Sequence, residues 1–207
     1  MIQKIRSTYR RLRYGSPIVV VSGLPRSGTS MAMKMLEAGG MPVVADGVRE
    51  ADVDNPKGYY EDERVKDLAQ MDDKSWLADS RGRVIKIISF LLFHLPEDNN
   101  YKILFMRREL DEVLASQAKM LDHRDEESET EDDRMRTVYE SHLWRVGYLL
   151  KHNAYLETLE VPYTAVLDDP AGQAKRINDF LGGGLNVDKM AAVADRSLYR
   201  NRVKTEA

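Results

Sequence analysis

The chain has 207 residues, of which 43% are hydrophobic and 31% charged, and it contains no cysteine. This composition excludes collagen-like, low-complexity and wholly disordered chains, and the lack of cysteine excludes disulfides, thiolate metal sites and cysteine nucleophiles. The net charge of −3 is unevenly spread. Residues 1–16 hold five cations and no acid, whereas residues 122–133 hold eight carboxylates and one arginine. The charges of the remaining residues nearly balance, which argues against a broad nucleic-acid surface.

Residues 1–16 form a basic leader that lacks the core of a signal peptide, because the apolar run Ile18–Val21 ends at Ser22 and Gly23. The richest later run, Ile87–Leu95, is far shorter than the ~20 residues that cross a bilayer. We therefore expect a cytoplasmic protein with no transmembrane segment. The leader either starts the domain as a solvated helix or lies on an anionic membrane or partner.

Strands and helices alternate along the rest of the chain. Pro17–Ser22 is short, β-branched and bounded by Pro and Gly, as buried parallel strands are, and Thr29–Glu37 has its apolar residues on one helical face. Further strands are expected at Met41–Ala45, Arg83–Ile88, Tyr101–Met106 and Leu156–Tyr163, and further helices at Glu61–Met71, Glu109–Leu121, Arg134–His152 and Pro170–Leu181. The alternation predicts one α/β domain over residues 17–207, a P-loop-type three-layer α/β/α fold whose central sheet is mainly parallel, with ligands at the carboxyl ends of the strands.

The segment GLPRSGTS, residues 23–30, joins the first strand to the first helix. Its two glycines have the separation of a Walker loop, but Thr29 stands where that loop has its lysine. Backbone N–H groups and the positive end of the helix dipole favour an anion at such a place. The alternative is a glycine-rich turn that only joins the strand to the helix.

A kinase or GTPase also needs a Mg²⁺-binding Asp at the end of a hydrophobic strand. The predicted strands instead run into Arg107 and Arg108, into Ser89 and into Thr164. A sulfuryl group carries one negative charge, so fixed cations can transfer it without a metal. Since the histidines also lack metal-ligand spacing, the sequence favours sulfuryl transfer and predicts no metal site.

Three motifs together resemble the sulfotransferases that use 3′-phosphoadenosine 5′-phosphosulfate (PAPS), most closely their short bacterial members. LPRSGTS is similar to the loop that binds the 5′-phosphosulfate. YKILFMRRELDEVLAS supplies Arg108 at a strand end and Ser116 eight residues later, which in the family bind the 3′-phosphate. VPYTAVLDDP places Tyr163 where a family tyrosine approaches the adenine, although packing of a core strand explains it too.

The resemblance implies PAPS as sulfuryl donor and adenosine 3′,5′-bisphosphate (PAP) as product. The loop residues that it assigns to the 5′-phosphosulfate are Arg26, Ser27, Gly28, Thr29 and Ser30. A C-terminal segment, SLYRNR, is similar to the basic tail that closes over the 3′-phosphate and adds Arg200 and Arg202. Considered alone, Arg108 can instead be a surface residue that neutralises acids of the following helix, and Ser116 can be a solvated helix residue.

For catalysis, the resemblance implies that Arg26 and Lys86 stabilise the charge that grows on the departing bisphosphate. The family often places a histidine two residues after the lysine, but this sequence has Ile88 there. NPKGYYE, which similar sulfotransferases carry, offers Glu61 as the base, and His94 is the substitute. The alternative for Glu61 is a helix N-terminal residue that interacts with the helix dipole.

Several alternatives stay open at this stage. The chain can instead be a small P-loop kinase or a non-catalytic binder of adenosine 3′,5′-bisphosphate. The acceptor, a hydroxyl or an amine, and the oligomeric state are unknown, and the loops Asp46–Tyr60 and Asp122–Asp133 are expected to set acceptor choice. The second of these loops should be mobile, because its carboxylates repel one another. His142 is expected to be a hydrogen-bonded core residue.

Overall fold

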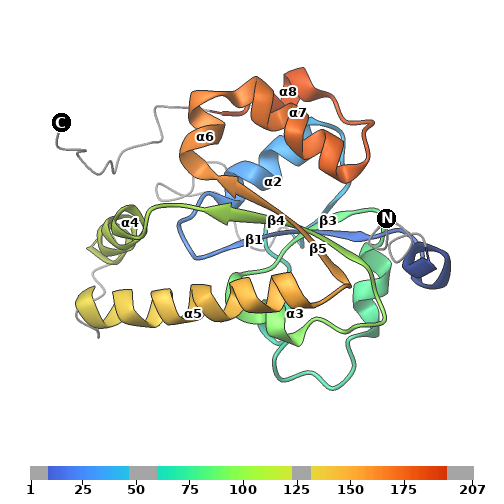
Figure 1. Ribbon diagram of the computed structural model, residues 1–207, viewed down its shortest axis with the longest axis horizontal. Helices are drawn as coiled ribbons and strands as arrows, with labels where there is room; N and C mark the ends of the chain where they lie inside the picture. Colours follow the sequence, from blue (N-terminus) through green and yellow to red (C-terminus); the bar gives the residue numbers. More distant parts are fainter. Residues whose placement is uncertain (1–8, 47–59, 123–131, 195–207) are drawn as a thin grey trace.

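A five-stranded parallel sheet forms the centre of the computed structural model, which describes residues 9–46, 60–122 and 132–194 (Figure 1). The strand order is β2-β3-β1-β4-β5, and every pair of neighbouring strands is parallel. The strands are β1 Ile18–Gly23, β2 Val43–Val44, β3 Val84–Lys86, β4 Tyr101–Arg107 and β5 Leu156–Pro162. This arrangement confirms the predicted α/β fold class and its parallel sheet.

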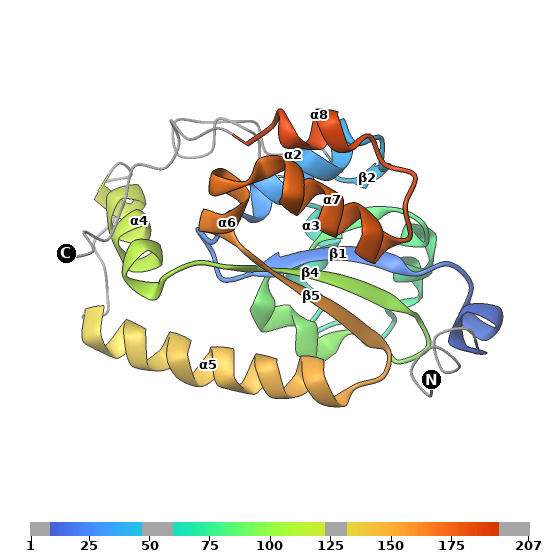
Figure 2. The ribbon, with the colours of Figure 1, turned by 45° about the horizontal axis from the view of Figure 1, so that its top comes forward.

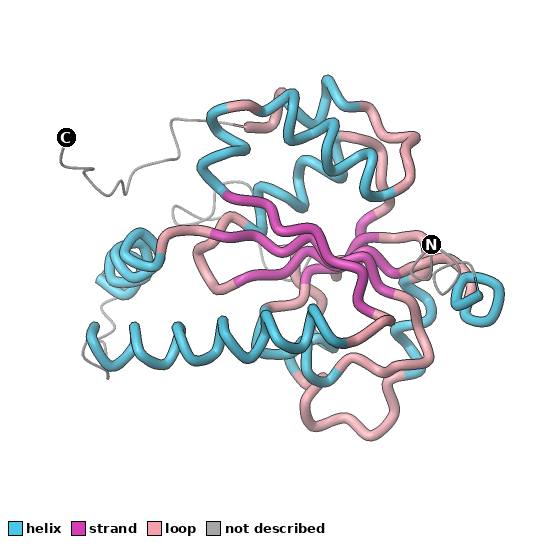
Figure 3. The backbone as a smooth tube through the Cα atoms, in the orientation of Figure 1, coloured by secondary structure: helices cyan, strands magenta, loops and turns pink. Residues whose placement is uncertain are grey.

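Helices cover both faces of the sheet, so the domain has three layers (Figure 3). One face carries α2 Thr29–Ala38, α6 Tyr163–Asp168, α7 Pro170–Leu181 and α8 Val187–Ala191 (Figure 1). The other carries α5 Asp132–His152, α3 Glu63–Lys66 and the 3₁₀ helices η1 Ser75–Ser80 and η2 Ser89–His94. Helix α4, Leu110–Asp122, follows β4 and lies beyond the carboxyl end of the sheet, beside α5 (Figure 2).

The central strand β1 is buried along its whole length, as its short β-branched sequence predicts. Val19 and Val21 pack with Met33 and Leu36 of α2 on one face. Alternate residues of the strand pack on the other face, against α5. Because both faces are covered, β1 is held rigidly, and the loop that follows it begins from a fixed point.

The strand register brings the predicted site residues to one edge of the sheet. Val21 of β1 pairs with Lys86 of β3, and Gly23 of β1 pairs with Met106 of β4. All three strands point the same way, so their carboxyl ends meet at that edge. The segments that follow β1, β3 and β4 therefore start beside one another, as expected for ligand sites of parallel sheets.

The helix predicted at Glu61–Met71 is wrong in length, because α3 ends at Lys66. The Asp62 side chain accepts a hydrogen bond from the Arg64 N–H and starts the helix. After it, the Leu68 N–H donates to the Val65 carbonyl, three residues back, and this tighter turn puts the fully buried Leu68 into the core. A tertiary contact thus overrides a helical pattern. The short elements α6, α8, η1 and η2 were not predicted either.

Residues 9–14 of the basic leader form a helix that docks at the opposite, amino-terminal end of the sheet. Arg10 Nε donates to Asn100 Oδ1 over 3.0 Å, and Asn100 Nδ2 donates back to the Arg10 carbonyl over 2.9 Å. The Arg10 guanidinium also lies over the ring of Tyr155, 5.8 Å from its centre. This part of the leader starts the domain, and residues 1–8 lie outside the described residues.

Among the described residues, no helix has the length and hydropathy that a membrane span requires. Most of the acidic segment, residues 123–131, and most of the loop at residues 47–59 lie outside the described part of the chain. The mobility predicted for the acidic segment and the part of both loops in acceptor choice stay predictions.

Candidate active site

The loop between β1 and α2 has the geometry of an anion cradle. Gly28 precedes α2 with φ 96°, in the left-handed region that glycine adopts at no steric cost. Arg26 is also left-handed, with φ 66°, a conformation that costs a residue with a side chain roughly 1 kcal/mol or more. The Ser27 hydroxyl donates to the Leu24 carbonyl over 2.7 Å and pins the loop. A glycine has no side chain to cap a helix, so α2 presents its first N–H groups at the end of this loop.

Arg26, Arg108 and Ser116, which we call the arginine cluster, lie together at this edge although they come from three segments. Arg26 Nε donates to the Ser116 hydroxyl over 3.1 Å. Arg108 Nη1 donates to the backbone carbonyl of Arg26, also over 3.1 Å. The structure therefore brings together the residues that the sequence assigned to the two phosphate groups of one nucleotide.

Arg108 and Ser116 are not the solvated residues of the alternatives, although Arg108 does neutralise an acid of α4. The Arg108 side chain is only 7% exposed and Ser116 only 6%. A buried guanidinium needs a counter-ion, and Glu112 of α4 supplies it, with Oε2 3.0 Å from Arg108 Nε. The carboxylate of Glu112 is itself 3% exposed.

Tyr163 is the first residue of α6 and lies directly over the loop, not within β5 as predicted. Its ring packs so close to Gly28 that a β-carbon there would come within 2.5 Å of ring carbon Cδ2. The Arg108 guanidinium lies 4.6 Å from the centre of the same ring. Tyr163 is thus a packing residue that locks loop and arginine together, and its contact with adenine stays a prediction.

Lys86 and Glu61, the predicted catalytic cation and base, form an ion pair at the end of β3. Lys86 Nζ lies 3.3 Å from Glu61 Oε1, and the side chains are 10% and 24% exposed. The pairing is non-local in sequence and was not predicted. It joins a cation and a proton acceptor into one unit beside the end of β1.

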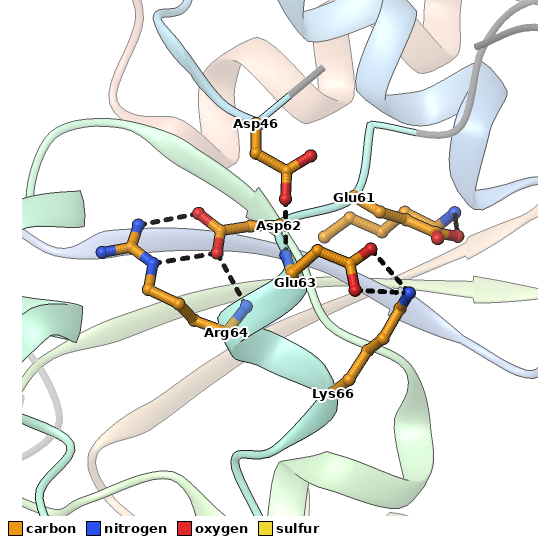
Figure 4. A network of polar contacts seen from close by, with 7 residues as sticks. Asp46, Glu61, Asp62, Glu63, Arg64 and Lys66 are labelled. Carbon is orange, nitrogen blue, oxygen red and sulfur yellow. Dashed lines mark hydrogen bonds and ion pairs between the residues drawn. The ribbon is translucent and has the colours of Figure 1, made fainter. Parts of the chain in front are cut away.

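A network of polar contacts fixes the chain on both sides of Glu61 (Figure 4). The Asp46 N–H donates to the Glu61 carbonyl, and the Asp46 carboxylate accepts from the Glu63 N–H over 2.7 Å. The Arg64 guanidinium binds Asp62 through two nitrogens, and these hydrogen bonds hold the pKa of the Asp62 carboxyl below its usual range. The start of α3 is therefore anchored, and Glu61 with it.

Tyr60 ties the same segment to helix α2. Its hydroxyl donates to Glu37 Oε2 over 2.6 Å, and burial together with that carboxylate raises the pKa of the phenol. Glu61 therefore stands between two anchors, one on α2 and one at the start of α3.

The remaining predicted residues have different outcomes. Thr29 is buried and Ser30 half-buried in the first turn of α2, and their contacts with a phosphosulfate stay predictions. His94 ends η2 and is half-buried. Arg200 and Arg202 lie outside the described residues. Within those residues, no three His, Cys, Asp or Glu side chains gather as metal ligands would.

No family model and no curated protein matches the chain. Among solved structures, it resembles the sulfotransferase domain from the curacin biosynthetic pathway, with a TM-score of 0.51 and 12% identity over 92% of this chain and 93% of that one. The chain has the fold of that sulfotransferase domain. Retinol dehydratase in complex with androsterone and inactive cofactor PAP aligns with a TM-score of 0.47 and 17% identity, over 93% of this chain and 68% of that one. A sulfotransferase from Alicyclobacillus acidocaldarius aligns with a TM-score of 0.45 and 16% identity, over 81% of each chain.

Within this sulfotransferase fold, Glu112 is the site residue that sequence reasoning missed. It lies four residues after Arg108, which precedes α4 and binds it, and four residues before Ser116, which shares its side of the helix. That spacing was visible in the sequence, but Glu109, Asp111 and Glu112 are all carboxylates close to Arg108, and the sequence does not show which of them binds it. Only the three-dimensional structure selects Glu112.

His142 confirms its prediction as a hydrogen-bonded core residue. It is 6% exposed, its Nε2 lies 2.8 Å from the Ser89 hydroxyl, and its ring stacks on Phe90 with centres 3.7 Å apart. Burial lowers the pKa of His142, with a smaller contribution from Arg145. This packing makes His142 part of the wall that follows β3.

Proposed function

We propose that the chain is a PAPS-dependent sulfotransferase that moves a sulfuryl group to an acceptor hydroxyl or amine. The observation that carries the proposal is the convergence of Arg26, Arg108 and Ser116 at the N-terminus of α2. Two guanidinium groups and a hydroxyl beside a helix N-terminus suit a ligand with two separate phosphate groups.

The residues fit a bisphosphorylated nucleotide in their chemistry as well as in their number. Arg108 is buried and held against a ring, a setting in which a planar guanidinium binds phosphate with defined geometry. The left-handed Arg26 and Gly28 turn the loop backbone around the place where a phosphate would lie. The fold alone does not select the donor; these side chains support it.

In the proposed reaction, the bond between sulfur and the bridging phosphate oxygen breaks, and its electron pair stays on that oxygen. Arg26 and Lys86 stabilise the charge that develops there. The acceptor oxygen forms the new bond to sulfur from the opposite side, and its proton passes to the Glu61 carboxylate. The 3.3 Å contact between Lys86 Nζ and Glu61 Oε1 supports a joint role for these two side chains in the reaction.

The test is calorimetry with adenosine 3′,5′-bisphosphate, AMP and ATP, each with and without Mg²⁺. We expect the bisphosphate to bind without Mg²⁺ and much more tightly than AMP. A hydrogen bond to a charged group contributes about 1.5–3 kcal/mol, and 1.4 kcal/mol is tenfold in affinity. Arg108→Ala should therefore weaken the bisphosphate at least ~10-fold and leave AMP nearly unchanged.

Arg107→Ala is the matched control, because Arg107 is the exposed neighbour at the end of β4. Its affinity for the bisphosphate should stay within about twofold of the wild type. A strict Mg²⁺ requirement with preference for ATP would favour a kinase. Tight bisphosphate binding without sulfuryl transfer to any of a panel of alcohols, phenols and amines would favour a non-catalytic binder.

A further inference from the structure

A buried carboxylate lies between two residues that are proposed to hold a phosphate. Glu112 is 3% exposed, its Oε2 lies 3.0 Å from Arg108 Nε, and it precedes Ser116 by four residues in α4. A carboxylate bound to the same guanidinium as a phosphate repels that phosphate, so its charge works against tight binding.

Glu112 has a clear role when no nucleotide is bound. The Arg108 guanidinium is held on three sides: Nε by Glu112, Nη1 by the Arg26 carbonyl, and one face by the Tyr163 ring. The first of these contacts is the one that brings a negative charge. A buried cation without a counter-ion is costly, so Glu112 is the group that lets Arg108 stay in place.

The arrangement changes when a 3′-phosphate arrives. The phosphate and the Glu112 carboxylate then share one guanidinium, and the two anions repel each other across a poorly solvated space. The carboxylate therefore reduces the net attraction of the site for the phosphate. AMP, which has no 3′-phosphate, does not meet this repulsion.

We propose that Glu112 is a positioning residue that holds Arg108 ready in the nucleotide-free protein and weakens its hold on the 3′-phosphate. The inference rests on the proposed function and deepens it. By this role, Glu112 sets the affinity for the bisphosphate product and the rate at which that product leaves.

Glu112→Gln separates the two roles. Glutamine keeps the side-chain length and an oxygen that accepts from Arg108 Nε, but it removes the negative charge. We expect adenosine 3′,5′-bisphosphate to bind at least ~10-fold tighter to this variant, with a correspondingly slower dissociation in stopped-flow measurements. AMP affinity should stay within about twofold, so the ratio of the two affinities rises.

Two further variants guard the interpretation. Glu109→Gln makes the same chemical change at an exposed position just before α4 and should leave both affinities within about twofold. Glu112→Asp keeps the charge and shortens the side chain, so bisphosphate affinity should not rise. A rise in the Asp variant equal to that in the Gln variant would show that a loosened contact is the cause, and would overturn the proposal.

The other outcomes are equally decisive. A Gln variant that binds the bisphosphate no better than the wild type, or that gains equally for AMP, overturns the role of Glu112. A wild-type protein that does not bind the bisphosphate overturns the proposed function itself. If the Gln variant unfolds without ligand, the bisphosphate should restore its near-ultraviolet circular dichroism and AMP should not; failure of that rescue also overturns the proposal.

Discussion

The two halves of the candidate site are built in different ways. The arginine cluster draws on the loop after β1, the end of β4 and helix α4, and its members Arg108 and Ser116 are less than a tenth exposed. In the Lys86–Glu61 pair the two charged groups lie 3.3 Å apart, and the Glu61 side chain is 24% exposed. Under the proposed function, nucleotide binding falls to the buried arginine cluster and proton transfer to the more exposed Lys86–Glu61 pair.

Breaking the Lys86–Glu61 pair should have the largest effect on turnover. Lys86→Met removes the cation and Glu61→Gln removes the proton acceptor while both keep the side-chain length. We expect each to lower sulfuryl transfer by ~10²-fold or more and to leave bisphosphate affinity within about threefold. Steady-state assays with labelled donor and calorimetry measure the two quantities.

Matched controls for these variants lie close by in α3. Lys66 and Glu63 form an exposed ion pair at the helix surface. Lys66→Met and Glu63→Gln should keep wild-type turnover, because exposed pairs contribute little. Unchanged turnover in Glu61→Gln would remove Glu61 from the mechanism and direct attention to His94.

Breaking the buried half should cost stability as well as binding. In Gly28→Ala the new β-carbon meets the Tyr163 ring at 2.5 Å in a backbone with φ +96°. We expect a loss of about 2–4 kcal/mol in the free energy of unfolding, together with weaker bisphosphate binding. Urea unfolding measures the first quantity and calorimetry the second.

Gly40→Ala is the control for that substitution. Gly40 has φ +95°, nearly the same, but a β-carbon there meets nothing within 4 Å. Its cost should be only the conformational one, about 1 kcal/mol. Equal losses for the two variants would mean that the contact between Gly28 and Tyr163 does not matter.

Ser116→Ala tests a single neutral donor of the cluster. Ser116 accepts from Arg26 in the structure, and its hydroxyl can donate to a phosphate. One neutral hydrogen bond contributes about 1 kcal/mol, so the bisphosphate should bind about fivefold more weakly. A loss as large as that of Arg108→Ala would show that Ser116 acts by placing Arg26.

The smallest effect concerns His142, which contacts Ser89 in the segment after β3. Its pKa is lowered in the folded chain, so below pH ~6.5 the unfolded chain binds more protons. The free energy of unfolding is therefore unaffected by protonation of His142 above that pH and decreases as the pH falls toward the pKa of His142 in the folded chain. The decrease is at most ~1.4 kcal/mol for each unit by which the folded and unfolded pKa values differ. Urea unfolding at pH 7.5 and 5.5 should show a smaller drop in His142→Gln than in the wild type.

Sequence reasoning predicted the parts of the fold whose signals are local. The strand before Gly23 and the helix Pro170–Leu181 have clear boundaries, since Pro and Gly mark them. The α3 region failed because the core position of Leu68 depends on distant strands.

The same distinction applies to the site. Arg108 and Ser116 share a motif and were found, but the contacts of Arg26 with Ser116 and of Lys86 with Glu61 join segments that are far apart in the chain. The spacing of residues in a motif identifies candidate residues for the site. It does not predict which side chains contact each other, because those contacts depend on how segments from different strands pack.

The central position of β1 has a consequence for how the protein is made. β1 ends at Gly23, but its neighbours β3 and β4 begin at Val84 and Tyr101, so neither exists when β1 leaves the ribosome. At roughly 5–20 residues per second, the 61 residues from Gly23 to Val84 take about 3–12 s to synthesise. During that time the apolar segment IVVVSG has neither of its neighbouring strands to pair with, and exposed hydrophobic segments of this kind are prone to aggregation. Slower elongation lengthens this exposure, so we expect the yield of folded protein to fall when translation through the first half of the chain is slowed.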